Sequence, residues 1–538
     1  MKLTGFLFAA ALLGSCTQPA AEENYTRHVD PKIGTGGHGH VFVGANVPFG
    51  LVQVGPTSIP QTWDWCSGYH ASDSTVIGFS HTHLSGTGIG DLFDVTVMPV
   101  TGEVTYARGT EDDPTSGLWS YADRTQEIAR PGYYSVPLTR YGIRAELTAT
   151  ARVGLHRYTF PASDAAAVVF DLENGGCWDK ATETHLAKEG DRTVTGWRHS
   201  TGWAKDQRVY FAAEFSKPFE KFETIGDNYA RASFRTTDGE QVSLKVALSP
   251  VSVEGAKANL AAELSGWDFD ATAKAADKAW NAELSKVKIE TADETARRIF
   301  YTALYHTMIA PSLFCDVNGD YYGSDHAIHR NADFTNYTTF SLWDTYRAAM
   351  PLMTVLHPEK MADIVQTMLH IADEQGRLPV WHLWGNETDC MVGNPGIVAV
   401  ADAIVKGIGG FDREKAFEAI RKTAMNPDRG NGLRMEYGYI PCEMFNEAVA
   451  YDMEYALADG AAARAAETLG KAEDAKYFEE RSHSYRNYFD PATRFMRGRD
   501  SRKGWRTPFN AFASTHRADD YCEGNAWQYT WLAPHDVK

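Results

Sequence analysis

Two carboxylates of this sequence, Glu523 and Asp344, stand among aromatic residues. Glu523 lies in Asp519-Asp-Tyr-Cys-Glu-Gly-Asn-Ala-Trp-Gln-Tyr-Thr-Trp531, and Asp344 lies in Phe340-Ser-Leu-Trp-Asp-Thr-Tyr346. Burial and nearby like charges raise the pKa of a carboxyl group, and a general acid needs a raised pKa at neutral pH. The pattern indicates acid–base chemistry on a bound ligand. In the competing interpretation, Glu523 is structural and Asp344 is a helix N-cap.

A second group of candidate residues lies nearer the N-terminus, in Trp63-Asp-Trp-Cys-Ser-Gly-Tyr-His70 and Phe79-Ser-His-Thr-His-Leu-Ser-Gly86. On a strand, His81 and His83 would share one face and could bind a metal, but no third ligand is evident. A polar, glycine-containing loop that presents Trp63 and Trp65 to a ligand is favoured. We therefore expect Trp63, Trp65, His81 and His83 to bind substrate. The alternative is a hydrogen-bonded loop packed on another domain.

The segment Asp316-Val-Asn-Gly-Asp320 has oxygen-bearing side chains at alternate positions, as calcium loops do. It fails the EF-hand pattern, because Tyr321 replaces the required glycine and Ala327 stands where a bidentate glutamate is needed. We expect a tight turn instead.

The composition limits the class of partner. Among 538 residues, 70 are acidic and 52 are basic, which gives a formal net charge of −18. Nucleic-acid binding requires Lys and Arg to neutralise phosphates, so we expect no nucleic-acid partner. Hydrophobic residues make up 43% and aromatic residues 12% of the chain, which excludes a disordered protein. The aromatic content suits a site that stacks on flat apolar faces, such as those of sugars.

The N-terminus has the pattern of an export signal. A short basic start precedes an apolar segment at residues 6–13 that is too short to span a bilayer, and Leu13-Gly-Ser-Cys16 follows. We expect residues 1–16 to be a lipoprotein signal peptide and Cys16 to become lipidated. The protein would then be an exported, periplasmic or outer-membrane lipoprotein anchored through Cys16. The alternative is an ordinary signal peptide with an incidental cysteine.

Six further cysteines are widely scattered and form no C-x-x-C pair. This spacing indicates neither a zinc ribbon nor a small disulfide scaffold. We expect most of them to be buried thiols.

Residues 25–265 have the pattern of β-strands. In the segment 143–150, Ile143, Ala145, Leu147 and Ala149 alternate with polar residues, which places one face of a strand in a core. Short apolar segments broken by Gly, Pro and Asp surround it. These features predict an N-terminal β-sandwich.

The pattern becomes helical after Ser265-Gly266. Thr291 and Glu294 have capping-box spacing, and apolar residues then recur at helical intervals from Phe300 to Met308 and from Met361 to Ala372. Further helices are expected at about 341–355, 397–408, 412–424, 443–458, 460–468, 472–487 and 524–533. Paired helices over 270–538 predict an (α/α)₆-barrel-like domain. The barrel needs twelve helices and about nine are predicted, so we expect it to lack its last helices.

Seven motifs of this chain together resemble glycoside hydrolase family 92, the calcium-dependent α-mannosidases. Besides Trp63 to His70, they are Val29-Asp-Pro-Lys-Ile-Gly-Thr-Gly-Gly-His-Gly-His40, Val47-Pro-Phe-Gly50, Gly78-Phe-Ser-His-Thr-His-Leu-Ser-Gly86, Ser341-Leu-Trp-Asp-Thr345, Gly385-Asn-Glu-Thr-Asp-Cys-Met391 and Glu523-Gly-Asn-Ala-Trp-Gln528. The resemblance implies a β-sandwich joined to an (α/α)₆ barrel, with the site at their interface. It also implies calcium-dependent hydrolysis of terminal α-mannosides with inversion.

By the same resemblance, individual residues acquire expected roles. Glu523 would be the general acid, Asp344 would hold mannose hydroxyls, and Trp63 or Trp65 would be a wall of the pocket. Calcium would hold mannose O2 and O3. The substrate would be a mannose-containing oligosaccharide.

The chain departs from the family pattern after Gln528. A Gly-Asn-Glu-Pro segment and a base-bearing Gly-Asn-Asp-Asp-Cys-Gly segment do not occur before Lys538, and Asn394-Pro395 replaces an aromatic residue and a histidine. We expect the general base and most calcium ligands to be absent and this chain alone to have little activity. The alternatives are a catalytically defective mannose-binding lipoprotein and, less compatible with the motifs, a glycoside phosphorylase.

Overall fold

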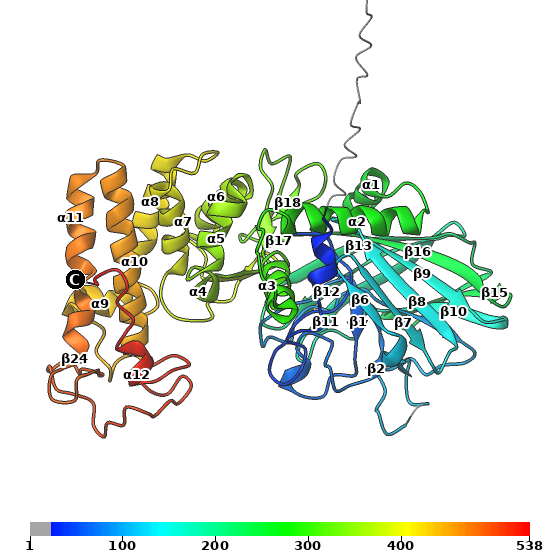
Figure 1. The fold of residues 1–538 in the computed structure, drawn as a ribbon, viewed down its shortest axis with the longest axis horizontal. Helices are drawn as coiled ribbons and strands as arrows, with labels where there is room; N and C mark the ends of the chain where they lie inside the picture. Colours follow the sequence, from blue (N-terminus) through cyan, green and yellow to red (C-terminus); the bar gives the residue numbers. More distant parts are fainter. Residues whose placement is uncertain (1–22, 114, 538) are drawn as a thin grey trace, which may run out of the picture.

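The computed structural model describes residues 23–113 and 115–537. Figure 1 shows a β-rich part made by the first half of the chain and a group of helices made by the second half, with α1 and α2 over the β-rich part and α3 between the two. Cys16 and the rest of the expected signal peptide lie outside the described residues. Within the described part of the chain, no helix is both long and apolar enough to cross a membrane. The predicted order, a β-sandwich followed by a helical domain, is confirmed.

Two antiparallel sheets of six and eight strands form the sandwich, and their facing side chains make one core. Phe170 of one sheet stacks on Phe211 of the other, with ring centroids 6.0 Å apart. The first sheet has the order β1 (Gly55–Thr57), β3 (Gly78–Ser80), β4 (Thr96–Thr101), β10 (Ser163–Asp171), β15 (Tyr229–Thr236) and β14 (Lys221–Ile225). The second has the order β11 (Lys180–Glu189), β12 (Thr193–Thr201), β13 (Gln207–Phe215), β16 (Glu240–Ser249), β9 (Val153–Phe160), β8 (Ile143–Ala149), β7 (Tyr133–Leu138) and β6 (Ile128–Arg130).

The alternating segment is strand β8, and its apolar residues are buried as predicted. The polar face of this strand is not open to solvent, because Glu146 and Thr148 are buried as well. Helix α2 (Phe269–Leu284) lies over this face. Arg157 forms two hydrogen bonds of 2.8 Å with the Glu146 carboxylate, which pairs its charge.

Helix α1 (Val253–Glu263) corrects the expectation that residues up to 265 are β-structure. It packs on β16 and β13 of the sandwich. Ser252 caps it by accepting a hydrogen bond from the Gly255 backbone at 3.0 Å. The helix was missed because most of its faces carry alanines and charged residues, so it has almost no periodic apolar stripe.

The capping box predicted at Thr291 is wrong by two residues. Asp293 is the N-cap of α3 (Glu294–His306), and it accepts hydrogen bonds from the backbones of Thr295 and Ala296. Thr291 instead accepts a hydrogen bond from the Asp293 backbone at 3.1 Å. An aspartate at this position is the stronger cap, since it also adds a negative charge at the helix N-terminus.

The predicted helices form with shifted ends. They are α4 (Leu342–Thr345), α5 (Ala349–Leu356), α6 (Pro358–Gln375), α7 (Pro395–Val405), α8 (Arg413–Ala424), α10 (Ala448–Thr468), α11 (Ala472–Arg481) and α12 (Ala526–Tyr529), together with the unpredicted α9 (Asn431–Tyr437). Neighbouring helices pack in pairs, notably α10 with α11 and α7 with α8.

Helix α10 joins two helices that were predicted separately around Gly460. Gly460 is buried, and a Cβ there would lie 2.9 Å from the side chain of His535. The helix tolerates a glycine because packing on both sides outweighs its propensity cost of about 1 kcal/mol. The missing side chain makes room for the imidazole.

Two smaller predictions are confirmed. The segment Asp316–Asp320 is a turn, in which Asp316 and Asp320 pair through a 2.8 Å backbone hydrogen bond. The six cysteines of the described part are free thiols, and four of them are buried.

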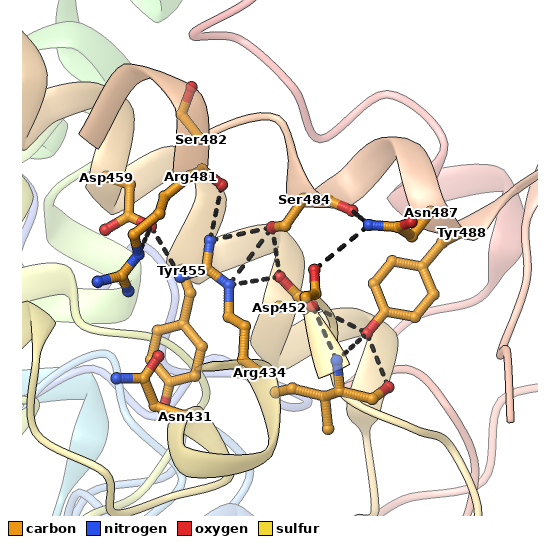
Figure 2. Close-up of polar contacts among 12 residues, drawn as sticks. Asn431, Arg434, Asp452, Tyr455, Asp459, Arg481, Ser482, Ser484, Asn487 and Tyr488 are labelled. Atoms are coloured by element: carbon orange, nitrogen blue, oxygen red, sulfur yellow. Dashed lines mark hydrogen bonds and ion pairs between the residues drawn. The ribbon is translucent and has the colours of Figure 1, made fainter. Parts of the chain in front are cut away.

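A buried ion-pair network holds the C-terminal helices together, as Figure 2 shows. Arg434 of α9 contacts Asp452 at 2.8 Å and Asp459 at 2.7 Å, both on α10. It also donates to Ser484 of the 3-10 helix η4 (Ser484–Tyr488) and to the Arg481 carbonyl of α11, so four helical segments meet at one guanidinium. Arg434, Asp452 and Asp459 are almost fully buried, and Arg481 supplies a second cation 3.2 Å from Asp459.

Candidate active site

Asp344 and Glu523, which lie 179 positions apart in the sequence, line one pocket in the helical domain. The pocket has a volume of about 310 Å³. Its other lining residues are Trp343, Arg347, Cys522, Gly524, Gln528, Tyr529 and Leu532. The structure therefore brings together the two carboxylates that the sequence singled out, with two aromatic rings beside them.

Asp344 is exposed on the short helix α4. It is not the N-cap, because Ser341 occupies that position. The Ser341 hydroxyl donates a hydrogen bond to Asp344 Oδ2. Asp344 therefore has a fixed orientation and an oxygen free to accept from a ligand hydroxyl.

Glu454 fixes this helix from behind. It lies on α10 and is 4% exposed, and its carboxylate accepts hydrogen bonds from Trp343 Nε1 at 3.0 Å, Tyr346 Oη at 2.8 Å and Arg347 Nη2 at 2.6 Å. Burial raises the pKa of Glu454, and Arg347 together with the hydrogen bonds opposes this rise. Trp343 and Arg347 line the pocket, so Glu454 sets the position of its wall.

Glu523 is exposed and has a left-handed backbone, with φ of 46°. Such a conformation is unfavourable for a side chain larger than that of Gly or Asn. It is held from both sides, since Tyr529 Oη donates to the Cys522 carbonyl at 2.7 Å and a capping box at Asn525 starts α12. Within the described part of the chain, no hydrogen bond engages the Glu523 carboxyl group, which leaves both of its oxygens available to a ligand.

A larger cleft of about 720 Å³ adjoins this pocket, and Cys522 lines both. Trp203 and Lys205 of the sandwich line it, and its other lining residues belong to the helical domain. Asp206 of the sandwich and Asn386 of the helical domain join the two domains beside it. The Asp206 backbone N–H donates to the Asn386 side-chain oxygen at 3.0 Å, and the Asn386 side-chain amide donates to the Asp206 carbonyl at 2.9 Å. Trp203 also packs edge-on against Trp381, at 4.6 Å between centroids. The larger cleft therefore lies where the two domains meet, and the pocket with Asp344 and Glu523 adjoins it on the side of the helical domain.

Trp63 and Trp65 form a single turn, η2 (Trp63–Trp65), on the sandwich. Trp63 is 50% exposed and donates to the Gly88 carbonyl at 2.8 Å. Trp65 is half-buried, stacks on His70 and donates to Asp73 at 2.7 Å. Neither residue lines the two pockets above. Trp63 presents an exposed ring, whereas most of Trp65 is used in packing.

His81 and His83 are placed in the sandwich core rather than on a ligand-facing surface. His81 is 0% exposed and shares hydrogen bonds with the Val95 carbonyl at 2.6 Å and with His156 at 2.9 Å. His83 contacts the Gln53 carbonyl at 2.7 Å. Burial lowers the pKa of His81 to about 3 and that of His83 to about 4, so both are neutral. In this conformation neither can touch a substrate, so the expected binding role does not agree with their positions.

The pocket residues do not by themselves form a calcium site. Calcium takes six to eight oxygen ligands, and the carboxylates that line the pocket are those of Asp344 and Glu523. In the described chain, the one cluster of three His, Cys, Asp or Glu ligand atoms lies elsewhere and contains an imidazole. The described residues therefore do not match the cofactor that the resemblance implies.

Two family models match the chain along most of its length. The glycosyl hydrolase family 92 N-terminal domain matches residues 28–249, and the family 92 catalytic domain matches residues 255–538. The chain belongs to glycosyl hydrolase family 92. It is therefore a glycoside hydrolase, and the boundary between the family's two domains falls between β16 and α1.

Solved structures from family 92 have the same fold. The α-mannosidase BT3965 from Bacteroides thetaiotaomicron, in complex with mannoimidazole, is 39% identical, with a TM-score of 0.92, over 96% of this chain and 71% of its own. The inverting mannosidase BT2199 from the same organism is 28% identical, with a TM-score of 0.86, over 97% and 72%. A protein of Arthroderma benhamiae described as an uncharacterized secreted glycosidase is 25% identical over 608 residues, covering 99% of this chain and 73% of its own length.

Three residues of this family 92 site were missed by sequence reasoning. Glu454 is hidden within an alanine-rich helix, and Trp203 stands in a loop of the sandwich. Glu447 lines the cleft and precedes α10 with a left-handed φ of 55°. Burial raises the pKa of Glu447, which makes it a further titratable group of the cleft. The available signal at Glu454 was an acidic residue between Met453 and Tyr455 in an alanine-rich helix.

Proposed function

We propose that this glycoside hydrolase is an exo-acting α-mannosidase that removes terminal mannose from mannose-containing oligosaccharides with inversion. The observation that carries the proposal is the pocket of about 310 Å³ that holds Asp344 and Glu523 beside Trp343 and Tyr529. Its volume is at the lower end of the range for small-molecule sites, which suits one terminal sugar. The adjoining cleft would take the rest of the oligosaccharide. Family 92 mannosidases of similar structure support the choice of sugar.

In the proposed reaction, Glu523 donates its proton to the glycosidic oxygen as the bond to the anomeric carbon breaks. Asp344 accepts hydrogen bonds from mannose hydroxyls and fixes the ring. In an inverting enzyme a second carboxylate about 6.5–9.5 Å from the acid activates water on the opposite face. Inversion is supported by BT2199, which is described as inverting. Trp63 is proposed to contact the sugar with its exposed ring.

The test is product analysis. Purified protein that carries the base-bearing segment implied by the family resemblance is incubated with an α-linked mannobiose, and the anomeric signals of the released mannose are followed by proton NMR in the first minutes. The proposal predicts that β-mannose appears first and then mutarotates. Initial α-mannose would overturn inversion. Saturable mannoside binding with no released sugar would instead support the mannose-binding alternative.

Calcium is proposed as the cofactor on the strength of the family resemblance alone. The described pocket supplies too few oxygen ligands for calcium, so none of the reaction steps above uses a calcium ion. The measurement is mannoside hydrolysis after EDTA treatment, followed by separate additions of Ca²⁺ and Mg²⁺. The proposal expects Ca²⁺ alone to restore the rate, and full activity in EDTA would contradict it.

We also propose that the protein is exported and anchored to a membrane through Cys16. The apolar segment before Cys16 supports this, and the Arthroderma relative is described as secreted. The variant Cys16→Ala should move the protein from the membrane pellet to the soluble fraction. Unchanged sedimentation with membranes would exclude the anchor.

A further inference from the structure

A cluster of three potential metal ligands lies outside both pockets of the proposed active site. It consists of Asp325, His329 and Glu374, whose ligand atoms all lie within 4.8 Å of one another. His329 Nε2 is 3.1 Å from Asp325 Oδ1 and 3.4 Å from Glu374 Oε1. A tetrahedral cation with ligand bonds of about 2.0–2.1 Å separates its ligand atoms by about 3.3–3.5 Å. One cation between the three atoms therefore requires only small side-chain movements.

The side chains come from two elements that are far apart in the sequence. Asp325 lies in the turn between β18 (Tyr321–Tyr322) and β19 (Ile328–His329), and Glu374 lies in the last turn of α6. Glu374 accepts hydrogen bonds from Tyr321 Oη at 2.9 Å and from the Ser324 backbone at 2.7 Å. Such outer partners orient metal-binding carboxylates. The ligand set is therefore held in place before any cation binds.

The imidazole is also fixed. Tyr321 stacks on His329, with ring centroids 4.8 Å apart and an angle of 9° between the planes. A Cβ at Gly323 would lie 2.7 Å from both His329 Nε2 and Asp325 Oδ1. The backbone of Gly323 is not left-handed, so no conformational need explains this glycine. Its lack of a side chain leaves open the space beside the two ligand atoms.

The charge of the cluster is unbalanced. Asp325 and Glu374 bring two negative charges, and in the described part of the chain neither forms an ion pair with Lys or Arg. The neighbouring Asp373 does have such a partner, Lys415, at 2.7 Å. A divalent cation would neutralise the two carboxylates and accept the imidazole nitrogen as a third ligand.

We propose that Asp325, His329 and Glu374 bind a divalent cation of the zinc class. One imidazole nitrogen with two carboxylates matches Zn²⁺ and similar borderline cations, whereas the hard Ca²⁺ prefers oxygen alone. Asp325 is exposed, which leaves the remaining coordination position open to water. This site is separate from the calcium of the proposed function.

The site's position gives it a structural role. Tyr322, on the same hairpin, donates to Asp206 of the sandwich at 2.9 Å, and His326 lies 3.5 Å from the same carboxylate. Asp206 follows Lys205, which lines the cleft between the domains. A cation that joins the hairpin to α6 would therefore stabilise the contact between the two domains beside the cleft.

The experiment is a titration of untagged, chelator-treated protein with ZnCl₂, followed by calorimetry and by thermal unfolding. We expect one equivalent to bind and the Tm to rise. Glu374→Gln and His329→Gln should each weaken binding at least 100-fold, and Tyr321→Phe should weaken it about 10-fold through the lost orienting hydrogen bond. The matched control Asp373→Asn, on the exposed side of the same turn, should bind like the wild type.

A spectroscopic measurement separates this site from adventitious binding. Co²⁺ bound in the same place should give visible absorption bands that disappear when Zn²⁺ is added, and millimolar Ca²⁺ should not remove them. Circular dichroism of the metal-free variants checks that they fold. If Glu374→Gln does not fold, His329→Gln is used as the variant that lacks a ligand. Absence of saturable Zn²⁺ binding, or equal binding by wild type and a folded His329→Gln, would overturn the proposal.

Discussion

Glu454 Oε1 lies 2.6 Å from Arg347 Nη2, and this ion pair joins the middle of α10 to the residues that follow α4. The carboxylate is buried and the guanidinium faces the pocket. One buried acidic group of an alanine-rich helix thus fixes Arg347 and Trp343, which line the pocket together with Asp344.

We predict that Glu454→Gln lowers both stability and catalysis. The amide cannot neutralise Arg347. Because the Arg347 side chain is 39% exposed, solvent screens the charge left behind, and the cost should be below the roughly 3–5 kcal/mol of a fully buried pair. Mannoside kcat/KM should fall on every substrate, mainly through KM, because the wall of the pocket moves. Glu467→Gln, at an exposed position of the same helix, is the control and should leave the Tm within error. A Glu454→Gln enzyme with wild-type KM would contradict the positioning role.

Glu523→Gln should lose activity according to the leaving group. The glutamine keeps the size of the side chain but has no carboxyl proton to donate, so a natural mannoside should lose about 10²–10⁴-fold in kcat/KM. An aryl mannoside whose phenolate leaves readily should lose far less. Glu473→Gln, an exposed glutamate of α11, controls for the substitution itself. Equal losses on both substrates in a variant with a lowered Tm would mean that Glu523 supports the start of α12 instead.

Asp344→Asn should behave differently from Glu523→Gln. If Asp344 binds mannose hydroxyls, the loss is the same for natural and activated mannosides, because the leaving group is not involved. A charged hydrogen bond is worth about 1.5–3 kcal/mol, or roughly 10–100-fold in kcat/KM. Calorimetry with mannose should show a matching loss of affinity. A leaving-group-dependent loss would assign proton transfer to Asp344.

Asp316 should make stability depend on pH. Burial raises the pKa of Asp316 to about 6, although Asn259 and Ser249 donate hydrogen bonds of 2.8 Å to it. The folded state therefore holds this proton more tightly than the unfolded state, whose aspartate pKa is about 3.9. The stabilisation that this proton gives to the folded state is fully present below about pH 4 and is lost as the pH rises to about 6. Over that range the free energy of unfolding should fall by roughly 2–3 kcal/mol.

The corresponding variant is Asp316→Asn, which is neutral at every pH and whose amide oxygen can still accept the hydrogen bond from Asn259. Its Tm relative to the wild type should increase between pH 4 and pH 6 and stay constant above that window. Parallel Tm profiles for the two proteins across the window would show that Asp316 does not titrate there.

Arg434→Met should destabilise the C-terminal helices. It leaves Asp452 buried without a cation, at a cost of about 3–5 kcal/mol, whereas Asp459 keeps Arg481 at 3.2 Å. Arg464→Met on α10 removes two exposed ion pairs, with Glu467 and Glu479, and should cost less than about 1 kcal/mol. Chemical unfolding of both variants gives the comparison. Similar small effects would mean that the network in Figure 2 contributes little net stability.

The sequence by itself determined the order of the two domains and the two carboxylates of the pocket. Alternation at residues 143–149 predicts a strand from period alone, and helical spacing at 361–372 predicts a helix, because both depend on neighbours in the sequence. Asp344 and Glu523 could be found because their aromatic neighbours are also local.

Only the tertiary structure decided which polar residues can reach a ligand. His81 and Trp63 come from equally polar segments, yet His81 is 0% exposed and Trp63 is 50% exposed. Glu454 forms a hydrogen bond with Trp343, which is 111 positions away in the sequence, and Glu374 forms one with Tyr321, which is 53 positions away. Burial and such distant contacts depend on how helices and strands pack on one another. The periodicity of the sequence reflects only neighbouring residues, so it could not predict that packing.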